Sequence, residues 1–319
     1  ISLNVVNIAV SFLASTKRLA MVRRIRLIFL REEPRLKEVA VVTGANTGLG
    51  FETALDLFQK GAKVIVACRS EEKGLDAIKR IEATSDGGEL VYGSLDLSSL
   101  TSVREFADKY KKDEQWLDLL VNNAGVMIPP ASKTVDGFEL QMGVNFVGHF
   151  ALTGHLFDLL EATNGSRVVT LSSIAHQNAS INFDNFRLEA DYEPWREYGQ
   201  SKLADMILML ELHKRLQEKG CQLASLGAHP GFSKTDLQKN MDEEVLNSLE
   251  LMSAKEGAQP TLTACLSPDA KSGQYWGPDG PNETSGKPAL AKIDSAALDE
   301  ETNKKLWDWA EEVTGVSFP

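Results

Sequence analysis

A tyrosine and a lysine four residues apart carry the clearest chemistry in this sequence of 319 residues. Tyr198 and Lys202 bound the run Tyr-Gly-Gln-Ser-Lys, near the start of an amphipathic stretch, residues 198–216, that predicts a helix. Positions i and i+4 share a helix face, so the hydroxyl and the ammonium can converge on one point. A nearby cation favours the phenolate of a tyrosine, whose free pKa is about 10, and makes it more useful as a general acid or base. By itself the pair is weak evidence, and a half-buried tyrosine beside a solvated lysine is the more common explanation.

A glycine-rich turn lies between a predicted strand, residues 38–43, and a predicted helix, residues 51–60. It reads Thr43-Gly44-Ala45-Asn46-Thr47-Gly48-Leu49-Gly50, with the spacing Gly-x3-Gly-x-Gly. Glycines at such a place let the backbone turn tightly and let a pyrophosphate approach the amides at the start of the helix. A tight connection without a ligand could have the same glycines, but its place in a repeating βα pattern favours nucleotide binding.

The rest of the chain continues to alternate strands and helices. Further strands are predicted at residues 63–68, 89–95, 116–121, 167–171, 222–228 and 274–276, and helices at 100–112, 140–160 and 296–313. This order predicts an α/β fold: a Rossmann-type, doubly wound parallel sheet of about seven strands, flanked by helices in three α/β/α layers.

Charged residues follow two of these strands at the edge where such a sheet binds its ligand. Arg69 ends the second strand, and its guanidinium suits the 2′-phosphate of NADP, whereas an acid there would accept the 2′-hydroxyl of NAD. A surface arginine paired with Glu71 or Glu72 is the alternative interpretation. Asp96 follows the third strand and is placed to meet an adenine edge.

Small and amide side chains follow the fourth strand. Asn122-Asn123-Ala124-Gly125 would allow a ligand to approach the backbone closely. Asn145 lies in an otherwise apolar predicted helix and must find partners, which could be neighbouring backbone groups or a held water.

Six motifs occur in the order and approximate spacing of the short-chain dehydrogenase/reductase family, which the chain resembles over about residues 35–319. They are Thr43-Gly44-x3-Gly48-x-Gly50, Asn122-Asn123-Ala124-Gly125, Asn145, Ser173, Tyr198-x3-Lys202 and Pro230-Gly231. Within the family the chain looks like the branch of the retinol dehydrogenases 11–14 and their bacterial, protochlorophyllide-reductase-like or daunorubicin-ketoreductase-like relatives. The marks of that branch are Thr-Gly-Ala-Asn-Thr-Gly at 43–48, Ala67-Cys68-Arg69 and Ser172-Ser173-Ile174-Ala175-His176.

The resemblance implies a bound NADP(H), preferred over NAD(H). The pyrophosphate would contact Gly44, Asn46, Gly48, Leu49 and Gly50, and the 2′-phosphate would contact Arg69. The adenine would contact Asp96 and Leu97, and the adenosine ribose would contact Asn123, Ala124 and Gly125. The nicotinamide end would contact Tyr198, Lys202, Pro230, Gly231 and Thr235.

The resemblance also implies a catalytic tetrad of Asn145, Ser173, Tyr198 and Lys202. Tyr198 would give a proton to a carbonyl oxygen while the cofactor delivers hydride, and Lys202 would lower the pKa of Tyr198 and bond the nicotinamide ribose. Ser173, with Ser172 as the alternative, would orient the carbonyl, and Asn145 would position a water that relays protons to Lys202. We therefore expect an oxidoreductase that interconverts a lipophilic aldehyde or ketone and an alcohol. A cofactor-binding sensor without turnover is the alternative, and the complete tetrad speaks against it.

Three segments are expected to surround the substrate. They are residues 126–137, a long spacer before Tyr198 that contains Ile181, Asn182, Phe183, Phe186, Tyr192 and Trp195, and an apolar lid at about 232–252. The lid segment could equally cover the core as an ordinary surface helix. His149, His176 and His229 are not at close ligand spacing, and no metal is expected.

Charge is unevenly distributed along the chain. The net charge is −11, of which residues 1–37 contribute +6 and the remaining body −17, so an acidic body argues against nucleic acid as the main partner. Residues 1–34 form a basic and apolar extension ahead of a single domain at 35–319. We weigh two interpretations of residues 1–31: a weak membrane anchor, or an extension that is poorly ordered or packed on the body.

Cysteine usage and two long predicted helices give the last expectations. Cys68, Cys221 and Cys265 are far apart and form no CxxC pair, which fits a reducing, cytoplasmic compartment. The family resemblance implies that residues 102–112 and 140–160 could form a four-helix homodimer interface.

Overall fold

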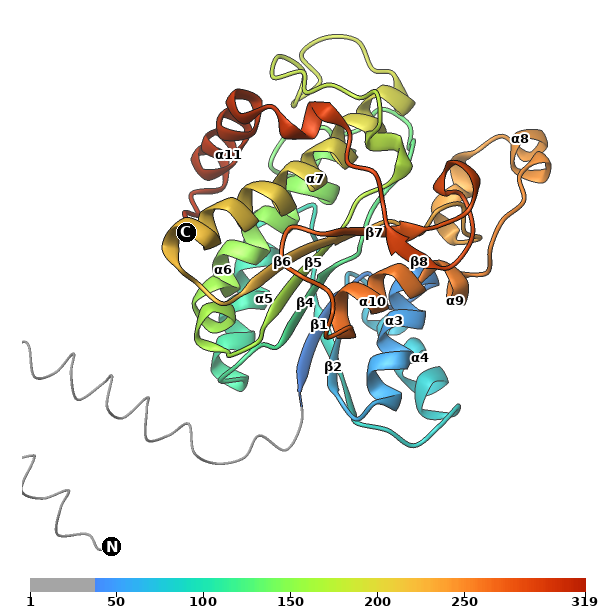
Figure 1. The fold of residues 1–319 in the computed structure, drawn as a ribbon, viewed down its shortest axis with the longest axis vertical. Helices are drawn as coiled ribbons and strands as arrows, with labels where there is room; N and C mark the ends of the chain where they lie inside the picture. The colour runs from blue at the N-terminus through green and yellow to red at the C-terminus, as the bar shows by residue number, and fades with distance from the viewer. Residues whose placement is uncertain (1–37) are drawn as a thin grey trace, which may run out of the picture. The chain divides into compact units, whose positions relative to one another are not determined.

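The computed structural model describes residues 38–319 and builds them on one eight-stranded sheet, in the order β3-β2-β1-β4-β5-β6-β7-β8 (Figure 1). The strands are β1 Val39–Thr43, β2 Lys63–Cys68, β3 Glu89–Ser94, β4 Leu119–Asn122, β5 Arg167–Leu171, β6 Ala224–Ala228, β7 Tyr275–Pro278 and β8 Pro288–Leu290. Neighbouring strands from β3 to β7 are parallel, and β8 pairs antiparallel with β7. The predicted Rossmann-type sheet is confirmed, with one antiparallel edge strand that the sequence did not indicate.

Alternating residues of the central strand β1 contribute to two separate hydrophobic cores. Val39 and Val41 of β1 belong to one hydrophobic cluster, and Ala40 and Val42 belong to the other. Successive side chains of a strand point to opposite faces, and β1 is buried on both, as a continuous β-branched run requires. The three-layer α/β/α arrangement therefore follows from the composition of the strands.

The helices divide between these two faces. They are α3 Gly48–Gln59, α4 Glu71–Glu82, α5 Leu100–Asp113, α6 Gly148–Ala162, α7 Pro194–Lys219, α8 Glu243–Ser248, α9 Ala254–Gly257, α10 Gln259–Leu266 and α11 Glu300–Thr314. Buried residues of α5, α6, α7 and α11 share the cluster of Val41, and those of α3, α4 and α10 share the cluster of Val42. α4 was absent from the predicted elements; its Ser70 N-cap and acidic first turn are the local signals for it.

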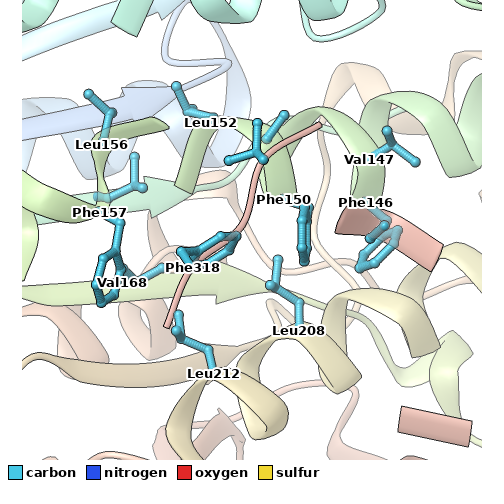
Figure 2. Close-up of a cluster of buried hydrophobic side chains, with 14 of the residues drawn as sticks. Phe146, Val147, Phe150, Leu152, Leu156, Phe157, Val168, Leu208, Leu212 and Phe318 are labelled. Atoms are coloured by element: carbon cyan, nitrogen blue, oxygen red, sulfur yellow. The ribbon is translucent and has the colours of Figure 1, made fainter. Parts of the chain in front are cut away.

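Aromatic packing fixes α6 against α7. Figure 2 shows Phe150 and Phe157 of α6 facing Phe318 near the chain's end, with Leu208 and Leu212 of α7 alongside. Ring centroids of Phe150 and Phe318 are 4.9 Å apart, and those of Phe157 and Phe318 are 5.8 Å apart. The two helices that carry the candidate site are thus held by well-packed aromatic rings.

One predicted helix boundary was wrong. α7 begins at Pro194 rather than Tyr198, because the Glu193 side chain accepts hydrogen bonds from the amides of Trp195 and Arg196 and proline occupies the first turn. The helix predicted at residues 140–160 does begin at Leu140, but it contains a π-helical turn, η1 Met142–Val147, before it continues as α6. π-turns inside helices are frequent at functional sites, and this one contains Asn145.

Expectations for the first 34 residues, including membrane association through residues 1–31, lie outside the described part of the chain. Within residues 38–319, no helix is long and apolar enough to cross a membrane. All three cysteines are free thiols, and Cys68 and Cys265 are buried.

Candidate active site

Tyr198 and Lys202 lie in the second and third turns of α7, both inside the protein. Their residues are 4% and 5% exposed. The Tyr198 hydroxyl makes no hydrogen bond to any group within residues 38–319, so it is available to a ligand. The Lys202 ammonium donates to the Leu171 carbonyl oxygen at 3.0 Å, which ties α7 to the carboxyl end of β5.

Lys202 has a second partner that the sequence reading missed. Its Nζ lies 2.8 Å from Oδ2 of Asp205, one helical turn further along α7, and both side chains are almost completely buried. Burial lowers the pKa of Lys202, but the nearby Asp205 and Tyr198 side chains raise it more, and the pKa lies above its ordinary value. Burial raises the pKa of Asp205 to about 7, although Lys202 opposes this. The signal in the sequence was an acid three residues after the lysine.

Asn145 uses its side-chain amide to join three segments. Its Oδ1 accepts from the Val126 amide at 2.8 Å, and its Nδ2 donates to the Val126 carbonyl at 3.0 Å and to Ser201 Oγ at 2.9 Å. Of the two kinds of partner considered for it, neighbouring backbone is therefore observed, while the relaying water stays a prediction. Asn145 fixes the segment after β4 to the Tyr198 helix.

His149 links the Asn145 backbone to Thr43 at the end of β1. Its Nδ1 lies 2.6 Å from the Asn145 carbonyl oxygen, so this nitrogen is the donor, and Nε2 lies 2.9 Å from Thr43 Oγ1. Thr43 Oγ1 in turn accepts from the amides of Asn123 and Ala124, each at 2.9 Å. Burial lowers the pKa of His149 to about 3, so the imidazole is neutral. Sequence reasoning had considered His149 only as a metal ligand.

The two serines after β5 occupy different environments. Ser172 is buried, and its hydroxyl donates to the Lys202 carbonyl oxygen at 2.7 Å. Ser173 is half-buried, and its Oγ accepts from the Ala175 amide at 3.2 Å, which leaves the hydroxyl proton free to donate. These contacts favour Ser173 over Ser172 as the group that meets a substrate oxygen.

The glycine-rich turn packs tightly on the segment after β4. A Cβ built on Gly50 would lie 2.5 Å from Asn123 Nδ2, and one on Gly44, whose φ is +66°, would lie 3.0 Å from Ala124 Cα. At Gly125 a Cβ would lie 3.7 Å from Lys202 Nζ, so this segment reaches the Lys202 ammonium. Only glycine fits where the backbones approach so closely.

The start of α3 is free to bind an anion. Its N-cap Thr47 makes no side-chain cap, and its first turn contains no acidic residue. The Thr47 hydroxyl instead donates to Asp236 at 2.9 Å, and a Cβ on Gly48 would lie 3.2 Å from Thr235, which brings Thr235 to the turn. Uncapped amides and the helix dipole suit a pyrophosphate, so the residues present fit a dinucleotide.

Arg69, Asp96 and Leu97, the positions predicted for the adenosine half, lie after β2 and β3. Arg69 is exposed and makes no ion pair within residues 38–319, so the predicted alternative pairing with Glu71 or Glu72 is not formed. One carboxyl oxygen of Asp96 accepts from the Ser98 amide and hydroxyl, at 2.9 and 2.6 Å. Leu97 is buried against α6. Ser99 is the N-cap of α5.

The other predicted wall residues divide between site and core. The rings of Trp195 and Tyr198 meet edge to face with centroids 6.3 Å apart, and Trp195 is 49% exposed. Tyr192 donates to the Pro129 carbonyl at 2.6 Å. Phe186, in contrast, is buried, with its ring centroid 4.3 Å from that of Trp309, so it belongs to the core.

The proposed lid forms a loop closed at its base. Ser233 and Met252 make a parallel bridge, and between them lie η3 Asp236–Asn240 and α8, which projects from the body in Figure 1. Asn240 donates to the Met127 carbonyl at 3.2 Å, and Gly231 precedes the loop with φ of +59°. The Asn240 contact attaches the loop to the segment after β4.

The remaining histidines have structural partners. His176 Nδ1 lies 2.6 Å from the Ser173 carbonyl oxygen, and His229 Nε2 lies 3.1 Å from Glu283. In the described part of the chain, no group of three or more His, Cys, Asp or Glu residues could hold a metal ion.

Comparison with known proteins gives consistent matches. The profile of the family described as short chain dehydrogenase matches residues 38–246. "Retinol dehydrogenase 12" of Mus musculus is 37% identical over 287 residues, covering 88% of this chain and 87% of the relative. A crystal structure of an uncharacterized protein from Mycobacterium paratuberculosis is 39% identical with a TM-score of 0.74, covering 88% of this chain and 95% of that one. The Pseudomonas aeruginosa RhlG/NADP active-site complex is 26% identical with a TM-score of 0.60, covering 75% and 94%.

Proposed function

The chain belongs to the short-chain dehydrogenase family, and we propose on that basis that it interconverts a lipophilic carbonyl compound and its alcohol with NADP(H). It is homologous to retinol dehydrogenases, which are enzymes acting on CH–OH groups (EC 1.1.1.-). The observation that carries the proposal is the Tyr198 hydroxyl, which has no hydrogen-bond partner among the described residues, on the same helix as the buried Lys202 ammonium. Membership of the family implies an NAD(P) cofactor and a small carbonyl or alcohol substrate.

The protein's own groups would hold the substrate and move a proton. NADP(H), when bound, supplies or accepts the hydride. The Tyr198 hydroxyl gives its proton to the carbonyl oxygen in reduction and takes it back in oxidation. Ser173, with a free hydroxyl proton, donates a hydrogen bond to the same oxygen and orients it. The Lys202 ammonium, held by the Leu171 carbonyl, stabilises the phenolate that remains.

The preference for NADP(H) rests on the position after β2. Arg69 is exposed and makes no ion pair among the described residues, so its guanidinium is available for a phosphate. The similar Pseudomonas structure is a complex with NADP. Asn46 in the glycine-rich turn is compatible with the same cofactor.

The lipophilic nature of the substrate rests on the site's surroundings. Trp195 offers a large, half-exposed ring beside Tyr198, and the loop at 232–252 contributes half-buried Leu237, Met241 and Met252. The similar mouse protein is named a retinol dehydrogenase, and retinol is an apolar alcohol. We propose that the loop acts as a substrate lid, that α5 and α6 supply a homodimer interface, and that residues 1–31 give a cytoplasmic protein weak membrane affinity.

Cofactor titration followed by turnover tests the proposed function. NADPH and NADH are titrated into the purified protein, and a panel of lipophilic aldehydes and ketones is then added. We expect tighter binding of NADPH and cofactor oxidation that is lost in Tyr198→Phe. Binding without turnover across the panel would favour the sensor alternative, and binding of neither cofactor would overturn the proposal.

A further inference from the structure

The Lys202 ammonium has a buried counter-ion on its own helix. Asp205 follows it by three residues, so the two side chains share a face of α7, and Nζ and Oδ2 are 2.8 Å apart. The Lys202 side chain is 6% exposed and that of Asp205 is 1% exposed. At this depth an isolated ammonium would be strongly disfavoured, and a close carboxylate compensates for its lost hydration.

The two contacts of the Lys202 ammonium also determine the direction in which its third N–H group points. An ammonium has three N–H donors, and Asp205 and the Leu171 carbonyl take two of them. The third is left for the side of the site bordered by Gly125, where an added Cβ would lie 3.7 Å from Nζ. Asp205 and Leu171 therefore hold the lysine from behind.

Asp205 is poorly suited to a purely stabilising role. Its second oxygen, Oδ1, is buried and makes no hydrogen bond within the described residues. Burying a carboxylate with one oxygen unpartnered costs free energy, and a buried ion pair is often no more stabilising than a neutral replacement of the same shape. A charge kept at such a cost calls for an explanation in the chemistry of its neighbours.

We propose that Asp205 is a positioning residue for the active site: its carboxylate keeps the almost completely buried Lys202 charged and directs the free N–H of Lys202 toward the bound cofactor and Tyr198. This inference rests on the proposed function, because it gives Lys202 the role stated there. Asp205 itself touches neither the cofactor nor the substrate and acts only through Lys202.

The groups that neighbouring elements place around Lys202 and Asp205 are uncharged, so Asp205 is the group that compensates the charge of Lys202. From α6, His149 is neutral, since burial lowers its pKa to about 3 and the charge of Lys202 opposes its protonation. From β7, burial raises the pKa of Tyr275 well above its ordinary value, so its hydroxyl is uncharged near neutral pH. From the end of β5, the Leu171 carbonyl and the Ser172 hydroxyl contact Lys202 and are neutral.

The test is Asp205→Asn, which keeps the shape and an acceptor oxygen but removes the charge. Without the carboxylate, burial disfavours the ammonium, so Lys202 loses its proton at lower pH. We expect the alkaline fall in NADPH affinity, followed through cofactor fluorescence, and the alkaline fall in kcat to move to lower pH by about one unit or more. At a pH between the two limbs, the loss of affinity is then about tenfold.

Glu211→Gln is the matched control on the same helix. Glu211 is buried and pairs with Arg215 at 2.9 Å, so the change removes one carboxylate of an ion pair two turns beyond Lys202. It should keep the wild-type pH profiles. Asp205→Glu, which retains the charge, should place both limbs closer to wild type than Asp205→Asn does.

The outcomes separate this inference from the proposed function. Profiles of Asp205→Asn that superimpose on those of wild type, or that move to higher pH, would overturn the role of Asp205 while leaving the enzyme intact. Should Asp205→Asn not fold, as judged by circular dichroism, Asp205→Ser removes the same charge and gives the same comparison. Wild-type protein that binds neither NADPH nor NADH would instead sink the proposed function.

Discussion

A 2.9 Å hydrogen bond from Asn145 Nδ2 to Ser201 Oγ joins the π-helical turn ahead of α6 to the helix that carries Tyr198 and Lys202. Ser201 passes the constraint on, because its hydroxyl donates to the Tyr198 carbonyl oxygen at 2.8 Å. The same Asn145 amide holds the Val126 backbone in both directions. One side chain therefore sets the relative positions of three segments around the site.

Removing the Asn145 amide should damage stability and activity together. Asn145→Ala leaves the half-buried Val126 amide and carbonyl without their partner, which should cost about 1–3 kcal/mol of unfolding free energy. We expect a lower kcat as well, since misplacing catalytic groups slows the reaction. Denaturant melts and steady-state kinetics measure the two effects. Asn303→Ala, which removes a buried amide bonded to Ala297 far along the chain, should lower stability and leave kcat unchanged in the folded protein.

Tyr198→Phe should separate binding from chemistry. The hydroxyl makes no hydrogen bond within the described residues, so its loss should hardly change stability. Turnover should fall by about 10²–10⁴-fold, the usual contribution of a general acid or base. NADPH titration should still give a near-wild-type Kd. A variant that keeps more than a tenth of the wild-type kcat would show that another group supplies the proton.

The two serines after β5 should respond differently to substitution. Ser173→Ala removes the proposed donor to the substrate oxygen and should lower kcat by about 10²–10³-fold. Ser172→Ala removes a buried hydrogen bond to the Lys202 carbonyl and should cost about 1 kcal/mol of stability, with a smaller loss of kcat. Kinetics and thermal melts of both variants in parallel decide the assignment. The reverse pattern would transfer the role to Ser172.

Arg69→Ala should weaken NADPH binding specifically. Hydrogen bonds to a charged group contribute about 1.5–3 kcal/mol, so the Kd for NADPH should rise by roughly 10- to 100-fold. The Kd for NADH should change little, since NADH lacks the 2′-phosphate. Arg104→Ala, at an exposed arginine of α5, is the control. Equal losses for both cofactors would place Arg69 elsewhere in the site.

Trp195→Ala should change substrate preference. The exposed ring beside Tyr198 is expected to cover apolar substrate surface, and removing it should raise KM for the most lipophilic aldehydes more than for small ones. A comparison of kcat/KM across chain length measures this. Leu298→Ala, at another exposed apolar residue, should leave the series unchanged.

The contribution of the two buried histidines His149 and His229 to stability should fall as pH drops below about 6.5, the ordinary histidine pKa. Burial lowers the pKa of His149 and of His229 to about 3 in the folded protein. Between these values the two histidines bind more protons in the unfolded chain than in the folded one, so their contribution to the free energy of unfolding decreases as pH falls. In His149→Gln the slope of unfolding free energy against pH in this window should be smaller by up to about one proton. An unchanged slope would mean that His149 is protonated in the fold.

The strands and the motif spacing could be predicted from the sequence because each depends on residues close together in the chain. The segment of β2 and that of β5 match their predicted bounds, since runs of β-branched residues between polar ends have few alternatives. The antiparallel β8 has three residues and a proline at its start, so it carries almost no pattern of its own. Its existence depends on pairing with β7.

The sequence by itself determined the family, the βα order and the positions of Tyr198 and Lys202, because each depends on residues close together in the chain. Tertiary structure alone decided which groups surround them. The Ser172 hydroxyl donates to the Lys202 carbonyl oxygen, 30 residues away in the chain, and the Asn145 amide donates to Ser201 Oγ, 56 residues away. Even Asp205, three residues from Lys202, becomes a counter-ion only because packing of α7 on the sheet excludes water from both. Burial, which sets the strength of a charge's interactions, is a property of the assembled layers.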